Sequence, residues 1–350
     1  MTADTSNPLP LPSALRRKAR PLDGEPGERR SHLPSLPDFL RTVEPDEDGI
    51  SLIEFSRSRL RPIEGDLLKY GAILFRGFAI GSPDEFAAWM KDVCGPPLPY
   101  DERSSPRQAV TSGVYTSTEY TAARRIAFHN ESSYRNSFPG KIAFWCMRPA
   151  ETGGETPIAH TGRVLARLPE EVRDAFRTRG WSCVRNYRPG LGMSWQESFQ
   201  TDDRRRVQEH CEREGLVMEW LGENHLRTTA VRDAIACRPQ THEESWFNHA
   251  AFFHISTLDL DLREALEAQF APRDLPANTF YGDGEPIPDD VVTTVRAAYE
   301  AESAVFAWRS GDVLLLDNVM VAHARSTFTG ERRVLVAMAE PLTADMVKAR

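Results

Sequence analysis

The spacing of apolar and polar residues predicts a β core with helices packed against it. Apolar residues recur at helical spacing in six segments, so we expect helices over 33–43, 52–71, 82–93, 161–180, 202–215 and 288–303. Apolar runs bounded by Gly and Pro predict strands over 72–78, 126–134, 141–150, 153–159, 244–256 and, interrupted by turns, 304–341. Helix starts are marked by Ser82 or Asp84 and by Thr201 or Asp202. The pattern favours an α+β protein whose core is mainly β.

The chain shows one candidate domain boundary, near residue 35. Residues 1–35 are rich in Pro, Arg, Ser and acids, a composition typical of a flexible segment. Between residues 40 and 345 the sequence contains neither an internal repeat nor a low-complexity linker. We therefore expect a single domain over 36–350.

Composition and charge restrict the classes of partner. With 40% apolar and 27% charged residues in a chain of 350, the composition is that of a soluble globular protein. The formal net charge of −8 disfavours a general affinity for nucleic acid or anionic membranes. Five scattered cysteines without a Cys-x-x-Cys pair indicate a reducing compartment, and we find neither a signal peptide nor an apolar run long enough to cross a bilayer. We expect a cytoplasmic protein with no nucleic-acid or membrane partner.

Three His-x-Glu pairs are candidates for a metal site: His129 and Glu131, His210 and Glu212, and His242 and Glu244. Side chains at i and i+2 point to the same side of a strand but diverge on a helix. The second pair lies in a predicted helix and cannot converge on one ion, and the third lies in a polar segment with no evident second ligand arm. The first pair stands at the end of a predicted strand, where one extended backbone can direct both side chains at one point.

His323 supplies a second arm for the first pair, because it lies between two predicted strands far along the chain. Two imidazoles and one carboxylate on one side of a metal form the facial triad of non-haem Fe(II) sites, which leaves the opposite positions open. The zinc motif His-Glu-x-x-His, a Cys/His zinc cluster, Gly-x-Ser-x-Gly and Gly-x-x-x-x-Gly-Lys do not occur in the sequence. An iron site is the favoured hypothesis, and a chance arrangement of the three residues is the alternative.

Two adjacent arginines follow His323 in the last predicted strand. Arg333 shares one face of this strand with Leu335 and Ala337, and we expect it to point inward, where a guanidinium can bind a carboxylate in bidentate geometry. Arg332 points the other way by the same alternation, so we expect it to face solvent or a surface ion pair.

Several stretches together resemble one enzyme family. His129-x-Glu131, GGETP at 153–157, GAILFRGF at 71–78 and DN…AHAR…F.GERRVLVAM at 317–338 resemble the taurine dioxygenase-like (TauD/TfdA-like) family of Fe(II)/2-oxoglutarate-dependent oxygenases. The segments SWQESFQT, ESWFNHAAFFH and YGDGEPIPDD resemble its SyrP-like and clavaminate synthase-like subgroup. The resemblance covers nearly the whole of the chain that we expect to fold.

The resemblance implies a fold and a set of roles. The fold is a double-stranded β-helix (jelly roll) with flanking helices, and the lid and part of the substrate pocket fall within about 160–300. By position, His129, Glu131 and His323 would bind iron, while Thr156 and Arg333 would hold the distal carboxylate of 2-oxoglutarate. Three further residues lie in motifs expected near the pocket, where each could touch substrate or fix a loop through a hydrogen bond: Tyr134, Asn248 and Arg325.

Three positions depart from the family pattern. Glu131 stands where Asp is usual in much of the family, which leaves an oxygen donor for iron and argues against a halogenase, in which a small residue vacates that position. Ala324 replaces the glycine of a common His-Gly-Arg sequence. Ala337 stands where taurine dioxygenase has a further arginine toward its sulfonate, so taurine is not the expected substrate.

The function implied is oxidation of an unactivated C–H bond with Fe(II), 2-oxoglutarate and O2, releasing succinate and CO2. The subgroup suggests hydroxylation of an amino acid or amino-acid-derived small molecule in natural-product biosynthesis, either free or bound to a peptidyl carrier protein. Desaturation or cyclisation with the same cofactors is the first alternative, and a non-catalytic metal-binding jelly roll is the second. The sequence specifies neither the substrate, nor the stereochemistry, nor the oligomeric state.

Overall fold

The computed structural model describes residues 28–29, 37–98, 108–117 and 121–349. The flexible segment expected over 1–35 therefore lies outside the described residues, except for Glu28–Arg29, which form strand β1. This strand pairs antiparallel with Glu44 and Pro45, near the start of the folded chain.

The larger of two facing sheets has eight strands. In spatial order they are β1 (Glu28–Arg29), β2 (Leu40–Pro45), β3 (Ala72–Phe75), β17 (Val313–Asp317), β7 (Ser137–Arg148), β20 (Arg333–Thr343), β5 (Val114–Thr116) and β4 (Ala109–Thr111). Neighbouring strands run antiparallel, apart from the parallel pair β2 and β3. The three central strands β17, β7 and β20 are apolar on both faces because both faces are covered, which is the reason for their near-continuous hydrophobic runs.

The smaller facing sheet has four strands in the order β16 (Ser303–Ala304), β9 (Ile158–His160), β18 (Val321–Arg325) and β6 (Ile126–His129). Its inner face packs on the larger sheet: Phe144 and Val336 of the larger sheet belong to the same buried cluster as Ile158 and Val321 of the smaller one. A two-stranded pair, β8 (Thr152–Gly153) with β19 (Phe328–Thr329), closes one end.

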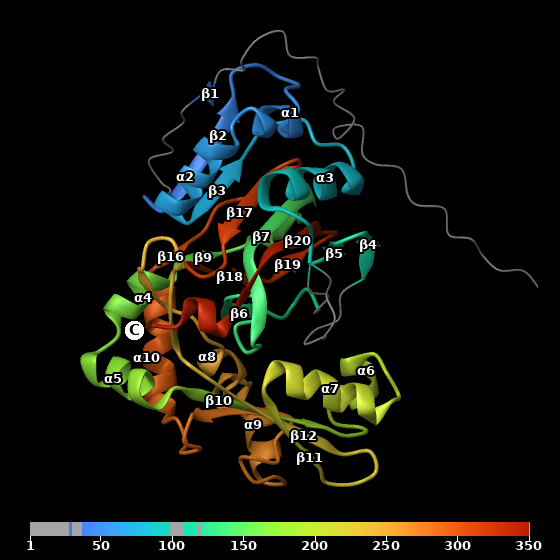
Figure 1. Cartoon of the computed structure of the whole chain (residues 1–350), viewed down its shortest axis with the longest axis vertical. Coiled ribbons are helices and arrows are strands. Elements are labelled where there is room, and N and C mark those ends of the chain that lie inside the picture. The colour runs from blue at the N-terminus through green and yellow to red at the C-terminus, as the bar shows by residue number, and fades with distance from the viewer. Residues whose placement is uncertain (1–27, 30–36, 99–107, 118–120, 350) are drawn as a thin grey trace, which may run out of the picture.

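Helices cover the outer face of the larger sheet. They are α1 (Leu52–Arg57), α2 (Leu60–Tyr70) and α3 (Pro83–Cys94), which lie at the top of Figure 1. On α3, Phe86 and Trp89 are fully buried against Trp145 of β7, and burial of side chains of this size stabilises the fold by roughly 2–3 kcal/mol each. The side chain of Ser82 caps α3 by accepting a hydrogen bond from the Glu85 amide, as predicted.

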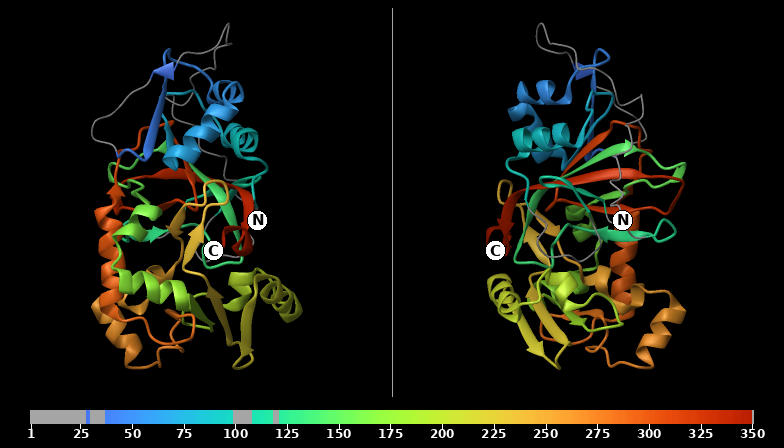
Figure 2. Two further views of the ribbon diagram at one scale, coloured as in Figure 1. Left: turned by 60° about the vertical axis from the view of Figure 1, so that its left-hand side comes forward. Right: turned by 90° about the vertical axis from the view of Figure 1, so that its right-hand side faces the viewer.

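Residues 161–302 leave the smaller sheet after β9 and return to it at β16, which pairs with β9. This excursion carries a third sheet, in the order β11 (Leu216–Trp220), β12 (Leu226–Arg232), β10 (Trp181–Tyr187) and β15 (Ala277–Tyr281), and the pair β13 (Ile235–Cys237) and β14 (Glu244–Trp246). Its helices are α4 (Thr161–Arg167), α5 (Glu170–Arg179), α6 (Trp195–Phe199), α7 (Arg204–Glu214), α8 (Ala250–Phe253), α9 (Leu260–Glu267) and α10 (Asp289–Ala301), with short 3-10 turns at Ile255–Thr257 and, after β20, Ala344–Val347. In Figures 1 and 2 the third sheet lies at the opposite end of the molecule from α1–α3.

The mixed helix and strand content confirms the α+β prediction, while several predicted elements differ, among them the following three. Residues 33–43 were expected to be helical, but 40–45 form β2, because pairing with β3 satisfies a backbone that local spacing alone assigns to a helix. The helix over 161–180 is split at Pro169, which begins α5 and cannot continue α4. The strand expected over 244–256 ends at Trp246, and α8 follows it.

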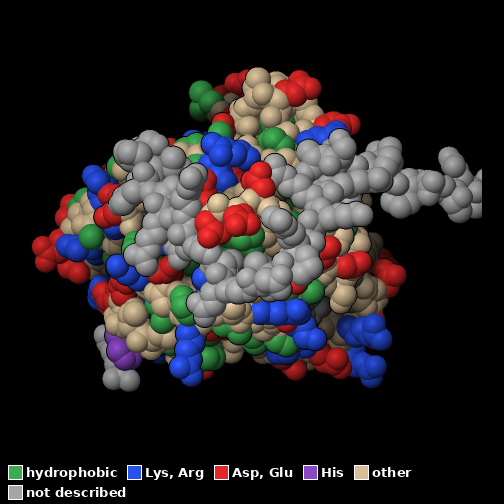
Figure 3. Space-filling model, turned by 90° about the horizontal axis from the view of Figure 1, so that it is seen from above, with side chains coloured by type: hydrophobic (Ala, Val, Ile, Leu, Met, Phe, Trp, Pro, Cys, Tyr) green, Lys and Arg blue, Asp and Glu red, His purple; other side chains and the backbone are tan. Residues whose placement is uncertain are grey.

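Surface charge on the top face is mixed. Viewed from above, Figure 3 shows acidic and basic side chains interspersed wherever grey residues do not cover them. In the described part of the chain, no helix is both long and apolar enough to cross a membrane.

Candidate metal centre and adjoining pocket

His129 and His323 are brought together by strand pairing. His129 ends β6, and His323 lies opposite it in the antiparallel partner strand β18. Their ring centroids are 4.3 Å apart. The Nδ1 atom of His129 lies 2.9 Å from the carbonyl oxygen of Ala127. With an Nδ1–H donating to that carbonyl, Nε2 keeps its lone pair, which is the tautomer that binds a metal.

Glu131 reaches the same point from the turn that follows β6. The next residue, Ser132, has a φ of 58°, so the chain reverses there in a left-handed conformation. A carboxylate oxygen of Glu131 lies 3.9 Å from Nε2 of His323, and the residue is 3% exposed. The local pair and the distant histidine therefore converge as predicted.

The three donors fit a divalent metal ion. Over residues 28–29, 37–98, 108–117 and 121–349, His129, Glu131 and His323 are the only group of three or more His, Cys, Asp or Glu side chains found to converge, with ligand atoms within 4.8 Å of one another. A buried carboxylate is costly unless an opposite charge balances it, and a cation held between it and two neutral imidazoles supplies that charge. Two nitrogens and one hard oxygen on one side are the donor set of non-haem Fe(II).

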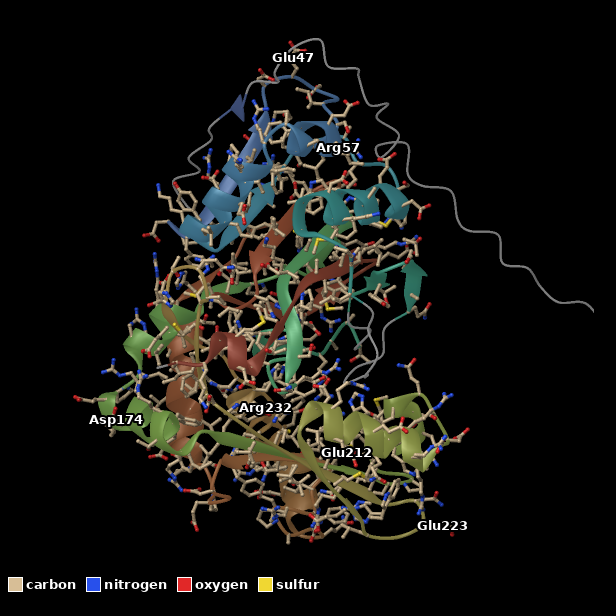
Figure 4. The ribbon with its side chains drawn as sticks, in the orientation of Figure 1. Glu47, Arg57, Asp174, Glu212, Glu223 and Arg232 are labelled. Carbon is tan, nitrogen blue, oxygen red and sulfur yellow. The ribbon has the colours of Figure 1, made fainter. Side chains whose placement is uncertain are left out.

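The other two His-x-Glu pairs do not converge. His210 is buried on α7 against Phe199, whereas Glu212, labelled in Figure 4, is exposed on the same helix. In the third pair, Glu244 bonds to Arg177 through both carboxylate oxygens. The divergence predicted from helical geometry is confirmed for the α7 pair.

A pocket opens beside the two histidines. It spans about 390 Å³, part of it open to solvent, and its described lining is Ser117, Ile126, His129, Phe144, Thr156, His323, Ala324, Arg325, Arg332 and Val336. Thr156 lies where the sequence places it, 3% exposed in the pocket wall. Its hydroxyl oxygen accepts a hydrogen bond from Nε1 of Trp308 at 3.1 Å and lies 3.4 Å from an Nη of Arg332.

The predicted orientations of the two arginines are wrong. Arg332 lines the pocket, and its guanidinium donates to the Gly154 carbonyl at 2.8 Å and the Ser117 hydroxyl at 3.1 Å. Arg333 is exposed at the start of β20. Among the described residues, no carboxylate pairs with Arg332, and its hydrogen-bond partners are all neutral. Burial, together with the nearby Arg325 charge, lowers the pKa of Arg332 to about 10, so the group stays charged at neutral pH.

The error has a physical origin in β20. Leu335 and Ala337 lie on the face that packs on α1–α3, whereas Val334 and Val336 lie on the opposite face, where Val336 lines the pocket. Both faces are apolar, so alternation reveals which residues lie together and not which face is the inner one. The ladder with β7 also shifts register between Arg333 and Val334, where the strand begins. Ala337 faces the helices as well, so its size carries no information about the substrate.

The GGETP segment approaches Arg332 closely. Gly154 has a φ of 72°, and a Cβ built on it would lie 3.0 Å from Cδ of Arg332 and 2.9 Å from Cβ of Ala150. Glycine is therefore required both for the backbone conformation and for the space that the arginine occupies.

The three candidate substrate residues make contacts within the protein. Arg325 is 5% exposed in the pocket lining and donates to the carbonyls of Thr121 and Arg124, in the segment that leads to β6. Asn248 donates to the Ala234 carbonyl and accepts from the Ala250 amide, which fixes the entry to α8. Tyr134 is 6% exposed, with its ring 5.1 Å from that of His249. The contacts of Arg325 and Asn248 are loop-fixing hydrogen bonds of the kind considered as the alternative, whereas that of Tyr134 is a ring contact.

His249 and His254 take no part in the converging group. Nδ1 of His249 lies 2.6 Å from the Ser133 hydroxyl, and Nδ1 of His254 lies 2.7 Å from the Ser256 hydroxyl. Burial lowers the pKa of His249 well below its ordinary value, and the nearby His129 adds to the effect. Both rings are packed structural groups.

Curated proteins resemble the chain over most of its length. The dapdiamide synthesis protein DdaC of Enterobacter agglomerans is 44% identical over 281 residues, which is 80% of this chain and 85% of that protein. A clavaminate synthase-like protein of Arabidopsis thaliana is 27% identical over 345 residues, covering 94% of this chain and 97% of its own.

Solved structures share the fold. The PvcB protein from Pseudomonas aeruginosa superposes with a TM-score of 0.55 at 15% identity, covering 95% of this chain and 99% of its own. A structure described as PvcB, an Fe, alpha-ketoglutarate dependent oxygenase from an isonitrile synthetic pathway, gives a TM-score of 0.52 at 14% identity, covering 95% and 98%.

The profile of one family matches residues 37–338, nearly all of the described chain. That family is described as taurine catabolism dioxygenase TauD, TfdA family, and its enzymes use Fe(II), 2-oxoglutarate and O2. The match agrees with the resemblance carried by the His-x-Glu, GGETP and GERR motifs. The chain belongs to this family and is an Fe(II)- and 2-oxoglutarate-dependent dioxygenase.

Proposed function

We propose that His129, Glu131 and His323 hold the iron of this dioxygenase. The observation that carries the proposal is their convergence on one point beside a pocket that ends in the guanidinium of Arg332, whose described hydrogen-bond partners are neutral. The three residues occupy one side of that point, which leaves the pocket side for exchangeable ligands. We also propose that the facing sheets form the expected double-stranded β-helix within a single domain over 36–350. The excursion over 161–302, close to the expected 160–300, is the proposed lid.

The other end of the pocket is suited to the far carboxylate of 2-oxoglutarate. Arg332 supplies a charged fork and Thr156 a hydroxyl, 3.4 Å apart, in a described lining that contains two arginines and neither Asp nor Glu. A carboxylate placed there would receive the charge-assisted bonds that the protein itself does not provide. We therefore assign to Arg332 the role that the sequence suggested for Arg333.

Bound iron and 2-oxoglutarate together supply the oxidation of an unactivated C–H bond by O2, in which 2-oxoglutarate becomes succinate and CO2 and the C–H becomes C–OH. The chain's own residues orient the co-substrate through Arg332 and Thr156. The wall formed by Phe144, Ile126 and Val336 excludes water from the reacting groups.

For the substrate we propose an amino acid or an amino-acid-derived small molecule of natural-product biosynthesis, free or bound to a peptidyl carrier protein, that undergoes hydroxylation. Support comes from the 44% identity to a protein whose name places it in dapdiamide synthesis. Desaturation and cyclisation use the same cofactors and are the alternative outcomes. Glu131 supports an oxygenation, because its carboxylate occupies the position that a halogenase leaves open.

Succinate formation tests the proposal. The purified chain is supplied with Fe(II), ascorbate, O2 and 2-oxoglutarate, and succinate is measured after adding single amino acids, or the same amino acids loaded on a carrier protein. We expect either the free or the carrier-bound amino acids to raise the rate of succinate formation well above the substrate-free rate. The amino-acid product should be heavier by one oxygen. A product lighter by two hydrogens would replace hydroxylation by desaturation or cyclisation.

A panel in which neither free nor carrier-bound amino acids stimulate turnover would reject the proposed substrate class. Glu131→Ala is the matched control, because residual turnover in that variant must come from contaminating metal rather than from the proposed site.

A further inference from the structure

Asn318 lies in the turn between β17 and β18, five residues before His323, and is fully buried. Its side-chain oxygen accepts a hydrogen bond from the Glu131 amide at 2.7 Å, and its side-chain nitrogen donates to the Glu131 carbonyl at 2.9 Å. One carboxamide therefore holds both main-chain polar groups of the acidic residue of the metal centre, 187 positions away in the chain.

Asn318 also forms hydrogen bonds with three other residues. Its side-chain nitrogen also donates to the Pro139 carbonyl at 2.7 Å, and its amide donates to the Gly140 carbonyl at 2.8 Å. Its carbonyl accepts from the side chain of Asn130 at 2.7 Å. The Glu131 turn, the start of β7 and the approach to β18 meet at this one residue.

Within the turn that Asn318 holds, the Ser133 amide donates to the Asn130 carbonyl at 3.3 Å. Glu131 lies beyond the last residue of β6, and the left-handed Ser132 follows it. A non-glycine residue in that region is strained and persists only where its surroundings determine it. Without the carboxamide, the main-chain amide and carbonyl of Glu131 would each lose the hydrogen bond that Asn318 provides.

We propose that Asn318 is a positioning residue that sets the direction of the Glu131 carboxylate toward His129 and His323. Only a side chain with a donor and an acceptor on one planar group can bind the N–H and C=O of a single residue together, as a neighbouring strand would. The inference rests on the proposed metal role of Glu131. The inference adds that the geometry of the metal centre depends on the Asn318 carboxamide, which bonds to the main chain of Glu131 and not to its carboxylate.

Asn186 provides a matched control. It is a buried asparagine in β10 of the third sheet, and its side chain makes four hydrogen bonds, one more than that of Asn318: to the carbonyls of Arg273 and Leu275, and from Arg227 and His225. Asn318→Ala and Asn186→Ala therefore remove the same group from equally buried sites and should lower the stability of the fold by similar amounts. The two variants differ in one respect: only Asn318→Ala removes hydrogen bonds to the turn that contains Glu131.

The test is Co(II) binding to the full metal-free chain, followed by titration and by the visible absorption of bound Co(II), whose intensity depends on coordination geometry. We expect Asn318→Ala to weaken Co(II) binding by about 10–100-fold, the range typical for loss of a residue that orients a ligand, and to change the spectrum. Asn186→Ala should bind within about threefold of the parent chain with the parent spectrum.

Parent-like affinity and spectrum in Asn318→Ala would overturn the proposal, as would an equal loss in Asn186→Ala. If Asn318→Ala does not fold by circular dichroism, Asn318→Ser replaces it and is judged by the same two outcomes. Glu131→Ala separates this inference from the proposed function: parent-like Co(II) binding in that variant removes the metal assignment, whereas its loss alongside an unaffected Asn318→Ala removes only the positioning role.

Discussion

The two ends of the pocket have opposite electrostatic character. At one end a buried carboxylate lies between two imidazoles, 3.9 Å from one of them. At the other end a buried guanidinium is surrounded by a carbonyl and two hydroxyls, with no acid among its described partners. In the proposed function, a cation balances the charge at the first end and an anion balances it at the second. A small molecule that ligates a metal through one end and carries a carboxylate at the other satisfies both, which is the chemistry of 2-oxoglutarate.

The ends also differ in how they are built. The metal end depends on a strand pair that places His129 and His323 opposite each other and on a turn held by Asn318. The anion end depends on which face of β20 turns inward, and on a glycine that leaves room for Arg332. Removing a metal-end donor should therefore abolish the chemistry, whereas changes at the anion end should weaken co-substrate binding by graded amounts.

The largest effect is expected at the metal end. Glu131→Ala should abolish succinate formation and lower Fe(II) affinity by more than the 10–100-fold typical of an outer partner, because a direct donor is lost. Metal affinity and turnover are measured together. Glu212→Ala, in the α7 pair that does not converge, is the control and should match the parent chain. A fully active Glu131→Ala would show that the buried carboxylate is not a ligand.

At the anion end, Arg332→Ala should raise KM for 2-oxoglutarate by about 30-fold or more, since truncating one partner of a buried charge pair costs at least about 2 kcal/mol. Arg333→Ala removes an exposed side chain and should change KM by no more than about twofold. Steady-state KM values for the two variants decide between adjacent arginines. A larger rise in KM for Arg333→Ala than for Arg332→Ala would assign the 2-oxoglutarate carboxylate to Arg333, as the sequence suggested.

A smaller effect is expected at Thr156. Thr156→Val keeps the shape but removes the hydroxyl, and loss of one neutral hydrogen bond of about 1 kcal/mol corresponds to a KM for 2-oxoglutarate about fivefold higher. Thr156→Ser retains the hydroxyl and should stay near the parent value. If the serine variant is as impaired as the valine variant, the methyl group rather than the hydroxyl matters.

The smallest effect concerns the glycine behind Arg332. Gly154→Ala should destabilise the fold and also raise KM for 2-oxoglutarate about threefold, because the new Cβ would press on Cδ of Arg332, 3.0 Å away. Gly190→Ala is the matched control, since Gly190 has a similar φ of 78° and no atom within 4 Å of its built Cβ. It should lose stability through backbone strain alone and keep the parent KM; an equal change in KM in both variants would contradict a steric role.

Local patterns determined much of the scaffold. The amphipathic spacing in 82–93 and its serine cap produced α3 as predicted, and the apolar runs of β7, β17 and β20 produced the central strands. The third sheet within the excursion could not be predicted from local sequence, because its strands lie between Trp181 and Tyr281 and pair across long stretches of the chain. Residues 40–45 were also mispredicted from local sequence, because they form β2 by pairing with β3 although their apolar residues have helical spacing.

For the site, the sequence by itself determined the donor types and the pairing of His129 with Glu131 as neighbours along the chain, whereas the direction of Glu131 depends on the turn that follows β6. The tertiary structure alone decided that Arg332 rather than Arg333 faces the pocket, because both faces of β20 are apolar and only packing on α1–α3 distinguishes outside from inside. It also revealed the contact of Asn318 with Glu131, which spans 187 residues. The residue type determines which chemical group is available, whereas the direction of its side chain depends on the residues that folding brings into contact with it.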